Sequence, residues 1–410
     1  MRKRLKGLAI CLLLVAAACT AAIFVLTDRQ PLVNRSDAIS PASVAQAKRL
    51  FDANDPRHLR PGEIRTVAVP VSLIDEGVNY LAGRYLHARA RFAPISGQGD
   101  FRVSLSLPAN RFANLQIMAQ ATNGRLKIRH ARLGPMPLPA SLIELAIVRL
   151  VKLAGYEREW QLAGQSLLNV GFNARPSHIL LTYRWEPQIL DHARTVALAD
   201  EDIGYLKQAN LSFAASLDHR APGSAISLSD ILPSQFPAPG DSDARRARAV
   251  LLVLAAYLAE KDLASLVPQA RDWPRLKWVN ITLAGRHDLA QHFIVSAALA
   301  AWAGEPVADA IGLYKELEDA RHGSGFSFID LSADRAGTRF GEKAIGQPAE
   351  LFARLRAPLA DADLLPPVTD LPEDLHDPAF RSRFHNHESR EFKVMAAEIE
   401  RRLNTLSLYR

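Results

Sequence analysis

The sequence predicts an α+β protein with three parts: an N-terminal transmembrane helix, a domain of sheet and helices, and a mostly helical domain. Three observations support this. An uncharged stretch near the N-terminus is long enough to cross a bilayer. Residues 63–232 mix the alternation of strands with the periodicity of helices. Residues 242–356 are helical in pattern almost throughout, after a break rich in proline and glycine.

Composition narrows the classes of function. The chain has 410 residues, enough for two domains with cores of their own. Its formal net charge is +7, but four of the positive charges lie within the first six residues. No dense basic patch with interleaved aromatic residues follows, which argues against nucleic-acid binding. Both cysteines, Cys11 and Cys19, lie in the apolar stretch, so the rest of the chain has no thiol chemistry and no disulfide.

The N-terminus predicts a single membrane anchor. A basic tail at residues 1–6 precedes residues 7–26, which carry no charge and match the ~20 residues that span a bilayer as a helix. The basic flank favours an N-in orientation, and hence an inner-membrane protein with the bulk of the chain in the periplasm. Two alternatives stay open: a cleaved signal peptide, and a lipoprotein modified at Cys19, since Ala17-Ala18-Cys19 resembles the end of a lipobox.

Residues 27–62 are expected to form a stalk between the anchor and the first domain. The segment is polar and has scattered proline and charged residues. One short helix is expected near 43–52, with Ser40 or Ser43 as its cap.

The domain at 63–232 is expected to combine half-buried strands with two helices. A Ser72-x-x-Asp75 capping box predicts the first helix, over 72–85. Apolar and polar residues alternate in four segments, which predicts strands at 101–107, 115–121, 126–128 and 179–185.

The second helix of this domain, expected over 140–155, is apolar around most of its circumference. Such a helix must be covered by a sheet or a partner, or must contact lipid. With the preceding Leu-Gly-Pro-Met-Pro-Leu-Pro element at 133–139, it resembles the YpmS-like group of anchored bacterial envelope proteins. That resemblance implies a lipid-binding groove between helix and sheet, lined by Leu142, Leu145, Val148 and Leu150. The alternative is that these residues close an ordinary α+β core.

Residues 233–241 (PSQFPAPGD) are the expected linker between the two domains, because proline and glycine interrupt both kinds of periodicity. The helical domain follows at 242–356. A second stretch rich in proline and aspartate opens residues 357–410, which are expected to form an extended arm over the surface and a terminal helix.

The densest polar chemistry lies within 286–341. Asp288, His292 and Ser296 follow one another at intervals of four on an apolar helix, so they share one face. A carboxylate four residues from a histidine is able to orient its imidazole as a base or as a metal ligand. Asp288 and Ser296 are therefore expected to support His292. The alternative is that these groups only form hydrogen bonds within the helical bundle.

The next helix supplies a candidate general acid. Glu316 lies on the side shared with Gly312, which is expected to face inward. An inward Glu316 beside His292 would suit acid catalysis. Lys315 and Asp319, at i and i+4, are expected as supporting groups.

Several of the residues that follow are explained by the end of one helix and the start of the next. Gly323 is expected to end the helix in the left-handed conformation. Ser327 then begins the next helix with Asp330 in a Ser-x-x-Asp box. Because this gives Asp330 a structural role, we rank it as a support, below Asp334 as a catalytic residue.

The order of these polar residues resembles the YfiM-type predicted envelope lipoproteins, a family that is itself uncharacterised. The matching residues are His292, Ser296, Lys315, Glu316, Asp319, Gly323, Gly325, Phe326, Ser327, Asp330, Leu331, Asp334 and Gly337. The resemblance implies an envelope location and supplies no reaction.

Two functions are consistent with these patterns. We expect a non-enzymatic envelope protein that binds a lipid or an envelope protein partner, with no cofactor and no metal. The alternative is a hydrolase of peptidoglycan or another envelope polymer, with His292, Glu316 and Asp334 as catalytic residues. Glu316, followed by a glycine-rich turn, has the outline of lysozyme-like glycan hydrolases. A metal site formed by these three residues and His287 is a variant of the hydrolase.

Overall fold

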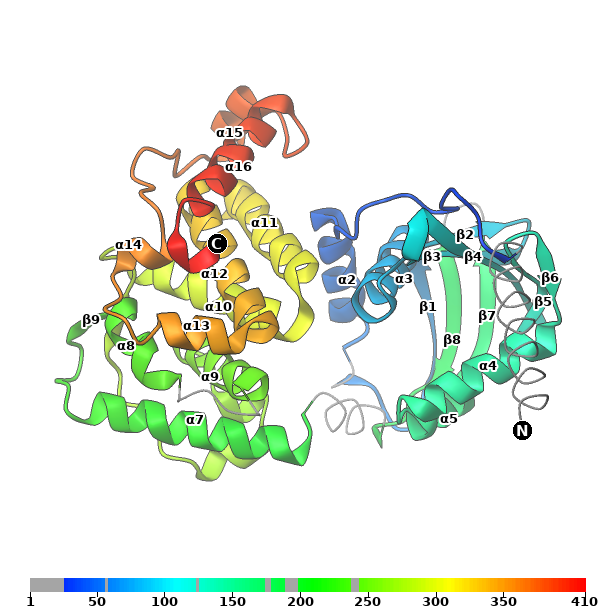
Figure 1. The fold of residues 1–410 in the computed structure, drawn as a ribbon. Coiled ribbons are helices and arrows are strands. Elements are labelled where there is room, and N and C mark those ends of the chain that lie inside the picture. Colours follow the sequence, from blue (N-terminus) through cyan, green and yellow to red (C-terminus); the bar gives the residue numbers. More distant parts are fainter. Residues whose placement is uncertain (1–25, 56–57, 123–124, 174–177, 189–197, 237–242) are drawn as a thin grey trace, which may run out of the picture. The chain divides into compact units, whose positions relative to one another are not determined.

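The computed structural model describes residues 26–55, 58–122, 125–173, 178–188, 198–236 and 243–410 (Figure 1). The chain divides into two compact units, residues 1–193 and 194–410. The first contains sheets and helices and the second is mostly helical, which confirms the predicted class at this level. The predicted anchor at 7–26 lies outside the described residues, apart from Leu26. Within the described part of the chain, no helix has the length and apolar character needed to cross a membrane.

The first unit is built on antiparallel sheets. Its strands are β1 Ile64–Pro70, β2 Ala88–Ile95, β3 Gln98–Leu107, β4 Arg111–Thr122, β5 Arg125–Leu133, β6 Met136–Leu138, β7 Leu167–Asn173 and β8 His178–Arg184, and its helices are α2 Pro41–Ala53, α3 Val71–Leu86, α4 Ala140–Leu153 and α5 Glu157–Ser166. One sheet has the order β2-β3-β4-β5-β6 and the other the order β1-β8-β7. Helix α3 packs against β2, and α4 against β5 (Figure 1).

The segment expected to be a stalk packs against the five-stranded sheet instead. The backbone amides of Leu32 and Val33 donate to Asn114 Oδ1 and Ser104 Oγ, at 2.9 Å in each case. These polar groups on the sheet are buried, so they need hydrogen-bond partners, and the segment supplies them. Ser40 caps the short helix that follows, as predicted.

The four residues expected to line a lipid groove are instead exposed on α4. Leu142, Leu145, Val148 and Leu150 have between 49% and 63% of their surface exposed, whereas Ile143 is buried. A groove between helix and sheet would require these four side chains to be covered by the sheet. Helix α4 therefore does not form the expected groove. The alternative, in which these residues close a core, is also wrong because they are exposed. One apolar face of the helix is left open.

The second unit packs helices around one continuous core (Figure 1). Its helices are α7 Asp200–Asp218, α8 Leu228–Gln235, α9 Asp243–Leu258, α10 His287–Ala303, α11 Glu305–His322, α12 Phe328–Gly346, α13 Pro348–Arg354, α14 Asp361–Leu364, α15 Asp377–Phe384 and α16 Arg390–Leu403. A short parallel pair, β9 Ala225–Ser227 with β10 Asn280–Thr282, joins distant parts of the chain and was not expected from the sequence.

The division between the units falls well before the expected linker at 233–241. Helix α7 precedes that stretch and α8 runs into its first residues, yet their Phe213 and Leu228 are buried in the same core as Leu254 of α9. Pro233 lies inside α8, and the stretch from residue 237 onward lies outside the described residues. Helices α7 and α8 therefore belong to the helical unit, because their apolar faces are buried there.

Helices α10 and α12 lie in close contact because glycines face their crossing. A Cβ atom on Gly337 would collide with the carbonyl oxygen of Phe293, and one on Gly341 with that of Ala297. The absence of these side chains lets the two backbones touch. The contact also brings the polar residues of the two helices together.

The C-terminal arm is more compact than expected. Instead of an extended chain before one helix, residues 357–410 contain α14, α15 and α16. Phe380, Phe384 and Phe392 of this arm are buried and pack against Phe326 and Phe328 at the start of α12. Aromatic rings of this size contribute strongly to a core, so the arm is an integral part of the unit.

Candidate active site

The site is centred on a buried histidine and the carboxylate that orients it. His292 Nδ1 donates to Asp334 Oδ1 at 3.1 Å, and Ser296 Oγ donates to the same oxygen at 2.7 Å. His292 is only 7% exposed. Burial lowers the pKa of His292, but the charge of Asp334 and its hydrogen bond outweigh this and raise that pKa to about 9. A proton held on Nδ1 leaves Nε2 facing the other side of the ring.

Asp288 does not have the role expected for it. Its Oδ2 accepts a hydrogen bond from Arg286 Nη2 at 2.5 Å. The spacing of four does place Asp288 and His292 on one face of α10, but the neighbouring guanidinium binds this carboxylate. The group that orients His292 comes from α12, which sequence spacing alone does not reveal.

Glu316 faces inward as predicted and is fully buried, with 0% of its surface exposed. Its Oε2 accepts a hydrogen bond from the Ser327 amide at 3.0 Å. Its Oε1 has no hydrogen-bond partner among the described residues, and Lys315 Nζ lies 3.6 Å away. Burial, followed by the charge of Asp334, raises the pKa of Glu316 to about 8.

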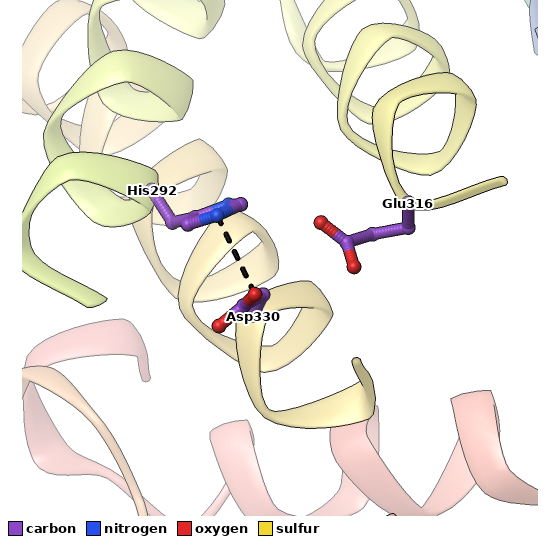
Figure 2. Close-up of side chains that lie close together, drawn as sticks. All are labelled: His292, Glu316 and Asp330. Carbon is purple, nitrogen blue, oxygen red and sulfur yellow. Dashed lines mark ion pairs between the residues drawn. The ribbon is translucent and has the colours of Figure 1, made fainter. Parts of the chain in front are cut away.

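Asp330 belongs to the site, which contradicts its lower rank in the sequence analysis. Its amide donates to Ser327 Oγ at 3.0 Å, as a capping box requires. The return bond to the Ser327 amide is made by Glu316, so the Asp330 carboxylate is not used for it. Asp330 Oδ2 lies 3.6 Å from His292 Nε2, and burial raises the pKa of Asp330 (Figure 2).

Lys315 and Asp319 form the more exposed side of the cluster. Lys315 Nζ donates to Asp319 Oδ2 at 2.8 Å and lies 3.3 Å from His292 Nε2. The Lys315 side chain is 52% exposed, in contrast to the buried groups behind it. Both residues therefore support the cluster, as the sequence predicted, from the side that faces solvent.

Three side chains from three helices converge at the centre of the site. His292 on α10, Glu316 on α11 and Asp330 on α12 point toward one another (Figure 2). One nitrogen or oxygen donor atom from each of them lies within 4.8 Å of the donors of the other two. This is an arrangement that a metal ion could occupy.

A neighbouring group of carboxylates already surrounds a cation. Asp288, Asp330 and Glu373 also have donor atoms within 4.8 Å of one another. Arg286 Nη2 lies 2.5 Å from Asp288 and from Glu373, and 3.6 Å from Asp330. Its guanidinium thus offsets part of the negative charge of this second group. Neither Arg286 nor Glu373 was predicted to belong to the site, and nothing in the local sequence pattern distinguishes them.

His287, which the metal variant of the hydrolase included, is held elsewhere. Its Nδ1 lies 2.9 Å from the carbonyl oxygen of Ile281. Asp330 takes the place that the variant gave to His287, and Asp334 orients His292 instead of lying among the three converging donors. The direct neighbours in sequence, His287 and Asp288, thus both point to partners outside the converging group.

The C-terminal arm fixes the turn that connects α11 to α12. Phe326 and Leu375 exchange backbone hydrogen bonds of 2.9 and 3.0 Å, and the Phe328 amide donates to Pro372 at 2.9 Å. Ser327, whose amide holds Glu316, lies between the two phenylalanines. The arm therefore positions the site, a role that the sequence did not indicate.

Gly325 rather than Gly323 provides the left-handed residue in this turn. Gly323 caps α11, as predicted, but with φ −127°, whereas Gly325 has φ 104°. A Cβ atom on Gly325 would also meet the backbone of Asp374 at 2.6 Å. Both the conformation and the closeness of the arm require glycine at this position.

Comparisons of the chain with protein-family models, with curated proteins and with solved structures each found no match. The resemblances to the YfiM-type and YpmS-like proteins therefore stay predictions.

Proposed function

We propose that this protein is a membrane-anchored hydrolase of an envelope polymer such as peptidoglycan, with its active site at His292, Glu316, Asp330 and Asp334. The observation that carries the proposal is convergence: four ionisable side chains from three helices meet although each is largely buried. Burying such groups costs free energy. Proteins concentrate such costs at functional sites, so the second of the two functions considered from the sequence is now favoured.

A network that serves stability alone would satisfy its own polar atoms. In this cluster, Glu316 Oε1, Asp330 Oδ1 and Asp334 Oδ2 are buried without a hydrogen-bond partner among the described residues. A fully satisfied network or an apolar core would be more stable than this arrangement. The free oxygens thus support a role in binding or chemistry.

The geometry suits the activation of a water molecule. Asp334 holds the His292 ring, so Nε2 and the Asp330 carboxylate face each other at 3.6 Å, close to where a water could bind both. Lys315 lies at the exposed side, where its charge would stabilise an oxyanion that develops during attack on a substrate. Hydrolysis needs these two elements, an oriented water and a stabilised negative charge.

The envelope location is part of the proposal and rests on the N-terminal sequence. Residues 7–26 carry no charge, basic residues precede them, and no cysteine follows. A polymer of the envelope, outside the cytoplasmic membrane, would be within reach of a domain tethered in this way.

The test is hydrolysis by the full-length chain, purified in detergent and incubated with isolated peptidoglycan. We expect the wild type to release soluble fragments, and Glu316→Gln and Asp330→Asn to release none. Glu318→Gln is the matched control, because Glu318 lies on the same helix but is partly exposed and pairs with Arg321. An inactive wild type, or a Glu316→Gln variant as active as the control, would overturn the proposal.

A second candidate function concerns the first unit and is independent of the site: α4 and α5 contact the surface of the bilayer. The open face of α4 continues to Tyr156 and Trp160, which are about half exposed. Leu26, the last residue of the predicted anchor, lies against Gly134, shortly before α4, since a Cβ atom on Gly134 would be 2.9 Å from the Leu26 carbonyl oxygen. The end of the predicted anchor thus lies near the start of the apolar helix.

This proximity favours a bilayer as the occupant of the α4 face. Apolar helices flanked by aromatic residues bind in the interfacial layer of membranes. Lipid contact would then be made at a surface, in place of the groove predicted from the sequence.

The bilayer contact is testable with a single label. In a full-length background with Cys11 and Cys19 replaced by serine, we would introduce Leu150→Cys or Phe51→Cys and attach a fluorescent label. Both positions are exposed, at 63% and 60%. In lipid nanodiscs, we expect a water-soluble quencher to reach the label at 51 and not the label at 150. Equal quenching at both positions would rule the contact out.

A further inference from the structure

We propose that the cluster binds one divalent metal ion, Zn²⁺ or Mn²⁺, through His292 Nε2, Glu316 Oε1 and the Asp330 carboxylate. A catalytic role for the ion rests on the proposed hydrolase function, whereas binding of the ion is measurable without any substrate. The sequence predicted a different metal set, with His287 and Asp334 in place of Asp330, because a helix cap accounted for Asp330.

The distances fit a metal site with a small adjustment. In a tetrahedral site with ligand distances of about 2.0–2.2 Å, the ligand atoms lie about 3.3–3.6 Å from one another. The donors of His292, Glu316 and Asp330 lie within 4.8 Å of one another. A shift of at most about 1 Å in each side chain would therefore complete the geometry. They come from three different helices, which hold them on a rigid frame.

Two of the three ligands are already oriented by a hydrogen bond on their far side. Asp334 accepts from His292 Nδ1, so Nε2 is the ring nitrogen that a metal ion would bind, with release of any proton that it carries. The Ser327 amide donates to Glu316 Oε2 and leaves Oε1 free. Outer partners of this kind accompany metal-binding histidines and carboxylates in proteins. The ring nitrogen of His292 that faces away from the proposed ion thus already has its carboxylate partner.

An unpartnered buried oxygen supports the binding of a cation at this place. Glu316 is fully buried, and its Oε1 has no hydrogen-bond partner among the described residues. Asp330 Oδ1 also lacks a hydrogen-bond partner there, but Arg286 Nη2 lies 3.6 Å from it. The nearby carboxylate group around Arg286 shows the contrast, since a guanidinium lies there within 2.5 Å of two of its members.

Lys315 does not fill the place of that cation. Its Nζ is 3.6 Å from Glu316 Oε1, longer than a hydrogen bond, and it donates to Asp319 instead. The half-exposed lysine lies beside His292 Nε2, so it would move toward Asp319 when the ion binds. Lys315 and Asp319 thus stand on the solvent side of the proposed ion.

The donor set defines the class of metal. One imidazole and two carboxylates suit Zn²⁺ and Mn²⁺, and no thiolate is present to favour softer ions. Three protein ligands leave at least one position open for a water molecule, as in catalytic rather than structural sites. Such an ion supplies a hydroxide at neutral pH, which is the nucleophile that the proposed hydrolysis requires.

The experiment measures ion binding on the full-length chain in detergent. The protein is treated with a chelator, dialysed against micromolar Zn²⁺ or Mn²⁺, and its metal content is determined by mass spectrometry together with its unfolding temperature. We expect about one ion per chain for the wild type and for Glu318→Gln, and a rise in their unfolding temperature. Glu316→Gln and Asp330→Asn should bind no ion at this site, and their unfolding temperature should not respond.

Equal metal content in the wild type and Glu316→Gln, with no response of either unfolding temperature to Zn²⁺ or Mn²⁺, would overturn the metal site. The unfolding temperature measured in chelator shows whether each variant is folded. An ion bound without any hydrolysis would refute the proposed function and leave the metal site standing. Hydrolysis that continues in the presence of the chelator would refute the metal site and leave the proposed function standing.

Discussion

The Glu316 side chain is completely buried, yet its carboxylate accepts only one hydrogen bond from the described residues. This combination costs folding free energy. Its Oε2 is satisfied by the Ser327 amide, while Oε1 has no hydrogen-bond partner among the described residues and lies 3.6 Å from Lys315 Nζ. Removing a buried ionisable group that serves function often stabilises a protein, whereas removing one that holds the fold together destabilises it. The two effects have different signs, which makes them measurable.

We therefore expect Glu316→Gln to stabilise the metal-free protein by about 1–2 kcal/mol. The amide keeps an oxygen for the Ser327 amide and offers an N–H group to the free carboxylate oxygens nearby. The measurement is denaturant unfolding in the presence of a chelator. A loss of more than about 1 kcal/mol would show that the glutamate is a structural group.

The orientation of His292 gives a second prediction. Asp334→Asn should weaken Zn²⁺ binding about 10- to 100-fold, because an amide no longer fixes the imidazole in the tautomer that exposes Nε2. Asp288→Asn is the control, since Asp288 binds Arg286 rather than His292. Titration with Zn²⁺ followed by calorimetry compares the two. If both variants lost affinity equally, the assignment of Asp334 would fail.

The residues of the site were predictable to the extent that local patterns determine them. Helical spacing correctly placed Glu316 on an inward face and His292 beside Ser296. It chose Asp288 over Asp334 as the partner of His292, because that choice depends on how α10 packs against α12. It also ranked Asp330 too low, since Glu316 makes the bond that a capping box would require of Asp330.

At the scale of elements, the contact between α10 and α12 determines whether the site exists. His292 and Ser296 lie on one helix, and Asp330 and Asp334 on the other. The backbones touch at Gly337 and Gly341, where glycine is required. The sequence did not predict that the C-terminal arm holds the α11–α12 turn, because backbone pairing between distant segments leaves no periodic signal.

Gly337→Ala should destabilise the protein by roughly 2–3 kcal/mol or more. The added methyl group meets the Phe293 carbonyl, which is main chain and unable to move without shifting α10. Gly346→Ala is the matched control at the end of α12, where a Cβ atom has no neighbour within 4 Å. There we expect a change near zero or a small gain from helix propensity. Thermal unfolding of both variants tests this, and equal stabilities would contradict the close packing.

At the scale of the whole molecule, the sequence predicted two units of the right kind but a different boundary. Proline and glycine at 233–241 interrupt periodicity, and this was interpreted as the end of a domain. The core crosses that stretch, because Phe213 and Leu228 on its N-terminal side are buried with Leu254 on its C-terminal side. Proline and glycine indicate a break in secondary structure, whereas a domain boundary depends on where the core ends.

The boundary leads to a prediction for fragments. A chain that begins at residue 198 should unfold cooperatively, whereas one that begins at 242 should not, because it lacks α7 and α8 and exposes the apolar surface they cover. Circular dichroism during heating distinguishes the two. Cooperative unfolding of the shorter fragment would restore the boundary predicted from the sequence.

The central claim is that the buried cluster carries out hydrolysis. It is tested most directly by the rate at which the full-length chain releases fragments from peptidoglycan, compared between Glu316→Gln and Glu318→Gln. We predict that Glu318→Gln keeps the wild-type rate and that Glu316→Gln loses at least about 100-fold while remaining folded. A Glu316→Gln rate equal to that of Glu318→Gln, or no release by the wild type, would contradict the claim.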